Sequence, residues 1–228
     1  MRTRGGVMNL RQAPCAALLA LLSGAGCATN EGKGAAIGAG GGALAGAGIG
    51  ALAGGGKGAL IGAAIGAGAG AATGAVIGHY MDKQQKALKE VKGAKVERRG
   101  DKLFVQFNSA ILFDTGKAAL KPQSKHDLGE FAKVLIQYKD TDLIIEGHTD
   151  NRGNRETNVK LSAARADAVI ALLVSDGVQR ARMTGRGLGA SEPVADNATD
   201  AGRRQNRRVQ VQIAANEQLR RKDAAAQR

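Results

Sequence analysis

Aromatic side chains are scarce in this sequence. The 228 residues include no tryptophan, two tyrosines and four phenylalanines, yet the formal net charge is +13. A basic balance of this size is typical of nucleic-acid-binding proteins, but single-stranded nucleic acid is held largely by stacking its bases on aromatic rings. Because such rings are nearly absent, the sequence predicts no nucleic-acid partner. It favours anionic lipid headgroups or wall polymers as partners for the excess charge.

Histidine and cysteine are also too few to indicate a metal centre. His79, His126 and His148 lie far apart and form no H-x-x-x-H pair, and no cysteine clusters with them. We therefore expect no metal site and no cofactor.

A Ser-His-Asp hydrolytic triad is the catalytic arrangement that the residue types at and after the end of the second predicted strand could form. His148 and Asp150 flank Thr149, and Ser162 follows nearby in the sequence. No serine occupies a G-x-S-x-G turn, which would expose it as a nucleophile. The sequence therefore predicts a protein that is not an enzyme.

The N-terminus has the pattern of an export signal. Three arginines precede a short apolar run at 16–22, which cannot span a bilayer, and small residues follow it. Residues 1–26 are therefore predicted to be a signal peptide. Removal of its three arginines lowers the formal net charge from +13 to +10.

Cys27 follows a Gly-Ala-Gly segment that resembles a bacterial lipobox, in which the cysteine is lipidated and becomes the first residue of the mature chain. The sequence departs from the usual pattern at Gly24, where leucine is common. The alternative is an ordinary signal cleaved nearby, which would leave one spare thiol. We expect lipidation at Cys27, with 27–31 as the lipidated N-terminal segment. By resemblance to bacterial sorting, Ala28 in the next position favours the outer membrane.

The stretch 32–78 consists almost only of Gly, Ala, Ile, Leu and Val, with glycine at every fourth position from Gly34 to Gly78. The segment 32–40 recurs, with small changes, 24 residues later. A helix of that length is about 36 Å long and would cross the hydrocarbon of a bilayer. Glycines around Lys57 separate the two copies. The pattern predicts a hairpin of two membrane helices whose glycine grooves pack closely. The same grooves could join several copies of the chain into a homo-oligomer. The alternative is a flexible glycine-rich linker.

Residues 102–214 have the mixed composition of a globular domain with one hydrophobic core. Segments with alternating apolar residues predict strands, and segments with helical spacing predict helices. Their order is β-α-β-α-β-β, an α/β (α+β) sandwich with helices packed on one sheet. We expect a linker helix at 79–101 and a basic, frayed C-terminal tail at 215–228. The strands are predicted at 102–107, 142–148, 182–185 and 207–213, and the helices at 121–138 and 158–174.

The candidate site lies where the second predicted strand ends. Asp150 follows this strand in the loop that leads to a helix, the usual ligand position of an open α/β sheet. Asn158, Leu161 and Arg165 share one face of that helix. A carboxylate and a guanidinium in one crevice form a complementary clamp for a zwitterion. The alternative, which the residues alone favour, is a simple ion pair between Asp150 and Arg165.

Five segments of the domain, taken together, resemble the OmpA-like peptidoglycan-binding domain shared by outer-membrane protein A, peptidoglycan-associated lipoprotein and the flagellar motor protein MotB. The segments are FDTGKAALKP, IIEGHTDNRG, NVKLSAARADAV, GRG and AGRRQNRRVQVQI. The resemblance covers about residues 102–214. It implies a βαβαββ fold that binds the meso-diaminopimelate of the peptidoglycan stem peptide without catalysis.

Matching the family motifs residue by residue implies which side chains bind diaminopimelate. The aspartate of the family's T-D motif corresponds to Asp150, and the arginine of its L-S-x-x-R-A motif corresponds to Arg165. The free end of diaminopimelate carries one ammonium and one carboxylate, so the resemblance favours the clamp over the simple ion pair. Asp114 has the alternative role of bracing the loop after the first strand. The other implied positions are Asn158, Asn206, Arg207 and Arg208, followed by Asp114, Thr149 and Leu161.

The glycine tract resembles the glycine-zipper segment that precedes such domains in some small outer-membrane lipoproteins. The whole sequence thus predicts a lipid-anchored protein that tethers the outer membrane to peptidoglycan, with its C-terminal domain in the periplasm. An alternative is a MotB-like stator or channel subunit. That function needs a membrane-embedded carboxylate, and 34–78 contains no Asp or Glu. A pore formed by the zipper is a third alternative.

Overall fold

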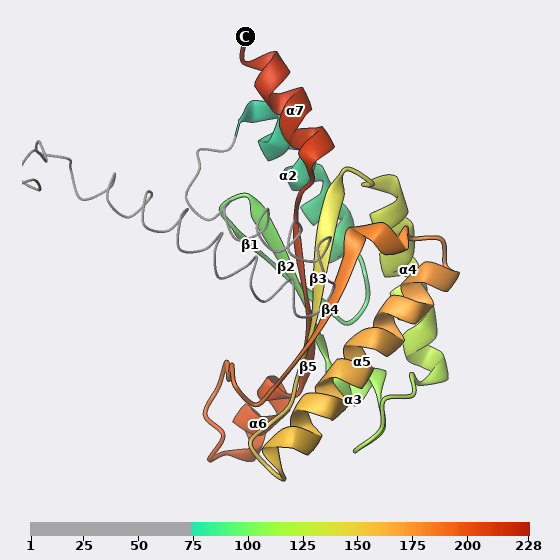
Figure 1. The fold of residues 1–228 in the computed structure, drawn as a ribbon, viewed down its shortest axis with the longest axis vertical. Helices are drawn as coiled ribbons and strands as arrows, with labels where there is room; N and C mark the ends of the chain where they lie inside the picture. The colour runs from blue at the N-terminus through green and yellow to red at the C-terminus, as the bar shows by residue number, and fades with distance from the viewer. Residues whose placement is uncertain (1–73) are drawn as a thin grey trace, which may run out of the picture.

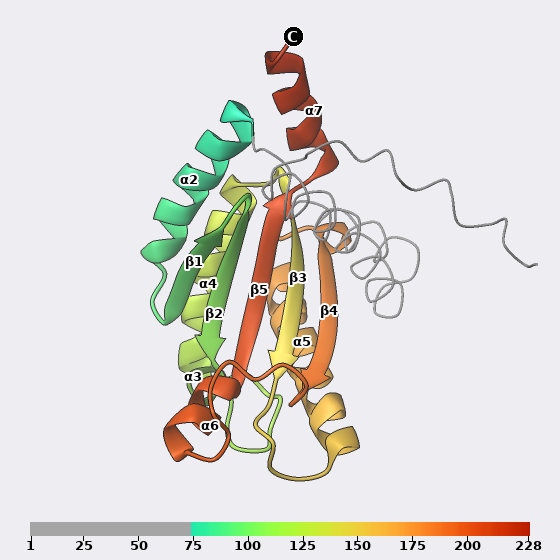
Figure 2. The ribbon, with the colours of Figure 1, turned by 90° about the vertical axis from the view of Figure 1, so that its left-hand side faces the viewer.

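The computed structural model of the protein describes residues 74–228. They form one mixed sheet with the strand order β1-β2-β5-β3-β4, in which β3 and β4 are parallel and the other neighbours are antiparallel. Helices α4 and α5 lie along one face of this sheet (Figure 1 and Figure 2). The elements are α2 (Ala75–Lys89), β1 (Ala94–Arg99), β2 (Lys102–Asn108), α3 (Ser109–Leu112), α4 (Pro122–Gln137), β3 (Thr141–His148), α5 (Arg155–Ser175), a 3-10 turn (Arg180–Arg182), β4 (Met183–Gly189), α6 (Asp200–Asn206), β5 (Arg208–Ala215) and α7 (Glu217–Ala226).

The core forms because apolar residues alternate along the central strands. Val209, Val211 and Ile213 of β5 are fully buried and lie in register with buried residues of β2 and β3. The helices cover this face of the sheet with their own apolar residues. Phe107 of β2 meets Phe131 of α4 edge-on, with ring centroids 5.3 Å apart. The predicted α/β class and the order β-α-β-α-β-β are confirmed for 102–214, with the short helices α3 and α6 in addition.

The segment 79–101 is not a linker helix, as we expected, but part of the domain. Its first part belongs to α2, and its second part is the strand β1, which pairs with β2. Gly93 and Gly100 make the turns on either side of β1 with φ values of 77° and 62°, which glycine adopts without strain. The prediction failed because charged residues conceal the alternation in β1. Only the partly buried Ala94 and Val96 contact the core.

The C-terminal segment 215–228 contains a helix, α7, that packs against α2. The carboxylate of Asp223 accepts hydrogen bonds from the backbone N–H groups of Val76 (3.0 Å) and Ile77 (3.2 Å). These N–H groups belong to the first turn of α2, where a helix has no internal partners for them. A Cβ at Gly74 would lie 1.8 Å from Asp223 Oδ2, so a larger residue there would push this carboxylate out of its present position. The tail is therefore fastened to the start of α2.

Asp223→Ala is expected to lower the free energy of unfolding by about 1 kcal/mol, the usual cost of losing a helix cap. For a domain of this size the melting temperature would fall by about 2–4 °C. Circular dichroism during thermal unfolding measures this change. Asp223→Asn is the control, because its amide oxygen still accepts a hydrogen bond. Equal melting temperatures for Asp223→Ala and the parent would contradict the capping role.

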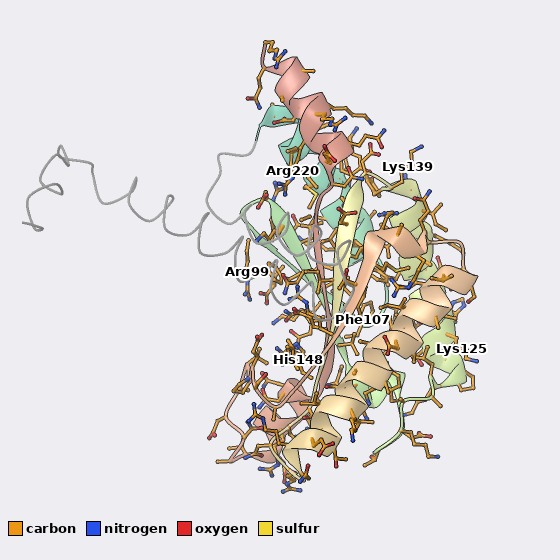
Figure 3. All side chains as sticks on the ribbon, in the orientation of Figure 1. Arg99, Phe107, Lys125, Lys139, His148 and Arg220 are labelled. Atoms are coloured by element: carbon orange, nitrogen blue, oxygen red, sulfur yellow. The ribbon has the colours of Figure 1, made fainter. Side chains whose placement is uncertain are left out.

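The two ends of the sheet carry different parts of the molecule. The first turn of α2 and the helix α7 lie at one end, and α6 with the loop after β3 lies at the other (Figure 1). Arg220 marks the first end and His148 lies towards the second (Figure 3). Among residues 74–228 we find no helix both long enough and apolar enough to cross a bilayer. The predictions for the signal peptide, for Cys27 and for the glycine tract up to residue 73 lie outside the described residues.

Candidate functional site

The loop that follows β3 holds a largely buried aspartate. Asp150 is 8% exposed, and its Oδ1 accepts a hydrogen bond from the backbone N–H of Arg152 at 3.1 Å. The preceding residue, Thr149, donates its backbone N–H to the carbonyl of Gly189 at 2.8 Å. The Thr149 hydroxyl donates to the carbonyl of Asp150 at 2.9 Å. The backbone at the ends of β3 and β4 therefore sets the position of the carboxylate.

Helix α5 starts directly after this loop. Asn154 caps it, and the Asn154 Oδ1 accepts a hydrogen bond from the backbone N–H of Glu156 at 2.8 Å. One turn into the helix, the amide of Asn158 donates to the carbonyl of Arg152 at 2.9 Å and to that of Asp150 at 3.4 Å. Asn158 therefore ties the aspartate loop to the helix that carries the next site residue.

Arg165 lies two turns further along α5 and is 4% exposed. Its Nε donates to the carbonyl of Lys117 at 3.0 Å, and its guanidinium carbon lies 5.1 Å from the centroid of the Phe113 ring. Burial and the nearby charge of Arg207 lower the pKa of Arg165, whereas Asp150 opposes this shift. Arginine keeps its proton in such surroundings. The site thus contains a buried positive charge held in a fixed orientation.

The partner of Asp150 is Arg207 rather than Arg165. Arg207 Nη1 forms an ion pair and hydrogen bond with Asp150 Oδ2. Arg207 lies between α6 and β5, and it reaches the loop after β3 because β5 and β3 are neighbours in the sheet. Asp150 also interacts electrostatically with Arg165. The Asp150 carboxylate is therefore paired with Arg207 and within electrostatic range of Arg165, and the surplus positive charge of the two guanidinium groups attracts an anionic group.

Two other predicted residues lie on the segments that carry or contact Arg165. Leu161 is half-buried on α5, between Asn158 and Arg165. Asp114 is exposed, and its carboxylate faces the ammonium groups of Lys117 and Lys121 at 3.7 and 3.6 Å. The loop that carries Asp114 touches the site through the carbonyl of Lys117, as described above.

Asn206 and Arg208 flank Arg207 but make different contacts. Asn206 is fully buried, and its Oδ1 accepts hydrogen bonds from two backbone N–H groups of the loop after β4, at 2.8 and 3.0 Å. Arg208 donates through Nη2 to the carbonyl of Glu192 in the same loop at 3.2 Å. Of these three consecutive residues, Arg207 is therefore the one that the structure brings to Asp150.

The sequence interpretation missed two contributors to the site, the ring of Phe113 and the carbonyl of Lys117. Both lie in the FDTGK segment that the resemblance had marked through Asp114. The phenylalanine at the head of this motif was the available signal. A backbone carbonyl has no signal in the sequence, since every residue type carries one.

The hydroxyl of Ser162 serves the contact between α5 and β4. It donates to the carbonyl of Val159 at 2.8 Å and accepts from the backbone N–H of Gly189 at 2.9 Å. Within the part of the chain that the structure describes, neither ring nitrogen of His148 has a hydrogen-bond partner. The same residues contain no group of three or more His, Cys, Asp and Glu side chains that could hold a metal ion.

The buried His148 ring makes the domain sensitive to acid. Burial, followed by the charge of Arg208, lowers the pKa of His148 to about 3. In an unfolded chain this pKa is about 6.5. Between these two values the unfolded state binds more protons than the folded state, so His148 lowers stability progressively as the pH falls below about 6.5. Glu146, which is buried on the same sheet face, has a raised pKa and acts in the opposite direction.

We therefore expect His148→Gln to lose less stability than the parent between about pH 7.5 and about pH 4.5. Urea midpoints of both proteins at the two pH values measure the difference. Comparing the two proteins removes the contribution of Glu146 and the other carboxylates to first order. Equal losses of stability in both proteins would contradict the assignment.

Comparisons with known proteins agree with the OmpA-like class that the motifs and the fold indicate. Residues 112–207 match the model of the OmpA family, and residues 8–82 match the model of the YMGG-like Gly-zipper. The resemblance drawn from the motifs is thus confirmed: a glycine-zipper segment precedes an OmpA-like domain.

The similar proteins include lipoproteins and a cell wall anchor. The chain is 40% identical over 140 residues to the probable lipoprotein YiaD of Escherichia coli, covering 60% of this chain and 64% of that one. It is 42% identical over 108 residues to the outer-membrane lipoprotein YfiB of Pseudomonas aeruginosa, covering 47% and 64%. The chain therefore spans less than two thirds of either lipoprotein. A solved structure described as the cell wall anchor of the T6SS from Pseudomonas aeruginosa superposes with a TM-score of 0.51 at 31% identity, covering 61% of this chain and 96% of that one.

Proposed function

We propose that Asp150, Arg165 and Arg207 form a crevice that binds the free end of diaminopimelate in the peptidoglycan stem peptide. The observation that carries the proposal is a buried carboxylate beside two guanidinium groups. The free end of diaminopimelate is a zwitterion. Its ammonium binds Asp150, and its carboxylate binds the planar guanidinium fork of Arg165.

Arg207 is the residue that makes room for the ligand. Its side chain is 35% exposed, whereas that of Asp150 is 11% exposed. The ligand's ammonium displaces Arg207 from one oxygen of Asp150, and the released guanidinium remains close enough to contact the ligand's carboxylate. The other oxygen keeps its hydrogen bond to the backbone N–H of Arg152. Binding therefore replaces the pair of Asp150 and Arg207 with two pairs, one between Asp150 and the ligand's ammonium and one between Arg165 and the ligand's carboxylate.

The protein acts as a non-catalytic tether between the outer membrane and the cell wall. Fatty acyl chains on Cys27 and the glycine zipper hold the membrane end. The domain holds the wall end through its crevice. The start of α2, which contains the last residues of the glycine tract, and the loop of Asp150 lie at opposite ends of the sheet (Figure 1), an arrangement that supports a tether. The names of the similar lipoproteins and of the similar wall anchor also support it.

Sedimentation of the full chain with two types of purified sacculi tests the ligand. Diaminopimelate-type walls display a free ammonium and carboxylate, whereas lysine-type walls display an ammonium alone. We expect retention on lysine-type walls to be about tenfold to a hundredfold weaker, because a charge-assisted hydrogen-bonded pair is lost. Equal retention on both types would overturn the proposal of diaminopimelate as ligand.

The membrane anchor needs a separate measurement. The intact mass of the protein from the membrane fraction is expected to correspond to a triacylated chain that begins at Cys27. An unmodified mass, or cleavage at another residue, would overturn the lipid anchor without affecting the wall-binding site.

A further inference from the structure

A hollow lies beside the first turns of α5, next to the proposed diaminopimelate crevice. Arg165 extends from α5 towards the loop after α3, whereas the hollow lies between α5 and the edge strand β4. Its volume is about 490 Å³, within the range of small-molecule sites. It is lined by Asn151, Gly153, Arg155, Asn158, Val159, Gly187, Leu188, Ala190 and Ser191.

The lining of the hollow combines three kinds of chemistry. Val159, which is 39% exposed, and Leu188 supply apolar surface. Asn151 and Ser191 supply amide and hydroxyl groups. Arg155 supplies a cation, and none of the ion pairs found among residues 74–228 involves it. Arg155 is also the first residue of the 21-residue helix α5, whose N-terminus favours negative charge.

This combination matches a group that has a small apolar side chain, an amide and a carboxylate. The C-terminal alanine of a peptide has all three. A neutral sugar has no carboxylate for Arg155, and none of the residues lining the hollow is aromatic. The chemistry therefore favours a peptide terminus over the glycan strand.

One residue joins the hollow to the loop of Asp150. Asn158 lines the hollow, and its amide donates to the carbonyl of Asp150. In the stem peptide, the residue after diaminopimelate is D-alanine. We propose that the hollow binds the D-alanine carboxyl terminus of the stem peptide whose diaminopimelate occupies the crevice. This inference rests on the proposed function, and it makes Arg155 a determinant of which stem peptides are bound.

The specific contacts follow from the lining. The D-alanine methyl group packs on Val159 and Leu188, its carboxylate pairs with Arg155, and its amide meets Ser191. A wall peptide that ends in a free D-alanine carboxylate therefore binds more tightly than one whose terminal carboxylate is blocked or consumed by a cross-link.

Two synthetic tetrapeptides test this inference with the full chain. Both contain diaminopimelate followed by D-alanine, and they differ only in a terminal carboxylate or carboxamide. Calorimetry is expected to show about fivefold tighter binding of the acid, because Arg155 pairs with it at a partly exposed site. Arg155→Ala should remove this difference between the acid and the carboxamide. Arg155→Glu should reverse the preference.

Lys160→Ala is the matched control, because Lys160 is an exposed cation on the same helix that pairs with Glu156 at 2.6 Å and does not line the hollow. It should keep the preference for the acid. Equal binding of acid and carboxamide by the parent overturns the inference, as does an acid preference that survives Arg155→Ala. If a sugar occupied the hollow, attaching the disaccharide to either peptide would strengthen its binding, and this result would also overturn the inference. Failure of both peptides to bind would instead overturn the proposed function.

Discussion

Asp150→Ala is expected to reduce retention on diaminopimelate-type sacculi by about a hundredfold or more. Without this carboxylate, the ligand's ammonium would enter a crevice that contains only the guanidinium groups of Arg165 and Arg207. Truncating one partner of a buried, hydrogen-bonded charge pair costs about 2–5 kcal/mol, and a hundredfold loss of affinity corresponds to about 2.7 kcal/mol. Arg165→Ala is expected to have a similar effect. Arg165→Lys should give an intermediate loss, because lysine keeps the charge but not the planar fork.

Arg152→Ala is the matched control for this series. Arg152 lies in the same loop, but only its backbone N–H contacts Asp150, and its 70% exposed side chain faces Asp200 at 3.6 Å. Retention should therefore stay near that of the parent. Asp150→Ala should change the free energy of unfolding by about 1 kcal/mol or less, because the partly exposed Arg207 can turn towards water. If Asp150→Ala and Arg165→Ala both still sedimented with sacculi, the assignment of the clamp would be wrong.

Gly147→Ala is expected to destabilise the whole domain. A Cβ at Gly147 of β3 would lie 2.0 Å from the carbonyl oxygen and 2.7 Å from the carbonyl carbon of Ser162 in α5. Both atoms are backbone, so the helix would have to move away from the sheet. Overpacking costs typically 1–3 kcal/mol and occasionally more. Because backbone rather than a flexible side chain must move, we expect a loss of about 3 kcal/mol or more, measured by urea unfolding.

The same substitution should weaken wall binding, since α5 carries Asn158 and Arg165. Gly129→Ala in α4 is the control, because its Cβ would meet nothing closer than the Asp176 carboxylate at 3.8 Å. Alanine is the better helix former, so this variant should be about 0.5–1 kcal/mol more stable than the parent. Unchanged stability of Gly147→Ala would show that α5 does not lie against β3 as described.

The helices and strands within 102–214 were predictable because their apolar residues repeat at regular intervals within a few residues. The buried Val209, Val211 and Ile213 alternate with polar residues in β5, and the apolar residues of α4 and α5 recur at helical spacing. The strand β1 escaped prediction because its charged residues mask the alternation. The helix α6 has seven residues, about two turns, which is too short for a helical period to stand out.

The residues of the candidate site were also predictable from local patterns, but their contacts were not. A position just after a strand identified Asp150, and spacing along a helix placed Asn158 and Arg165 on one face. The family motifs added Arg207, but no motif states which guanidinium contacts the aspartate. The support from the loop after α3 was not predictable either, because it uses the carbonyl of Lys117.

The sequence by itself therefore determined which residues could supply the charges of the site and on which elements they lie. The reason is that strand ends and helix faces follow from preferences within a few residues. Only the tertiary structure decided that Asp150 pairs with Arg207, 57 positions away, while Arg165 lies over Phe113 and bonds to the loop after α3. These partners meet because β5 lies between β2 and β3. That strand order depends on long-range pairing and burial, which no local pattern encodes.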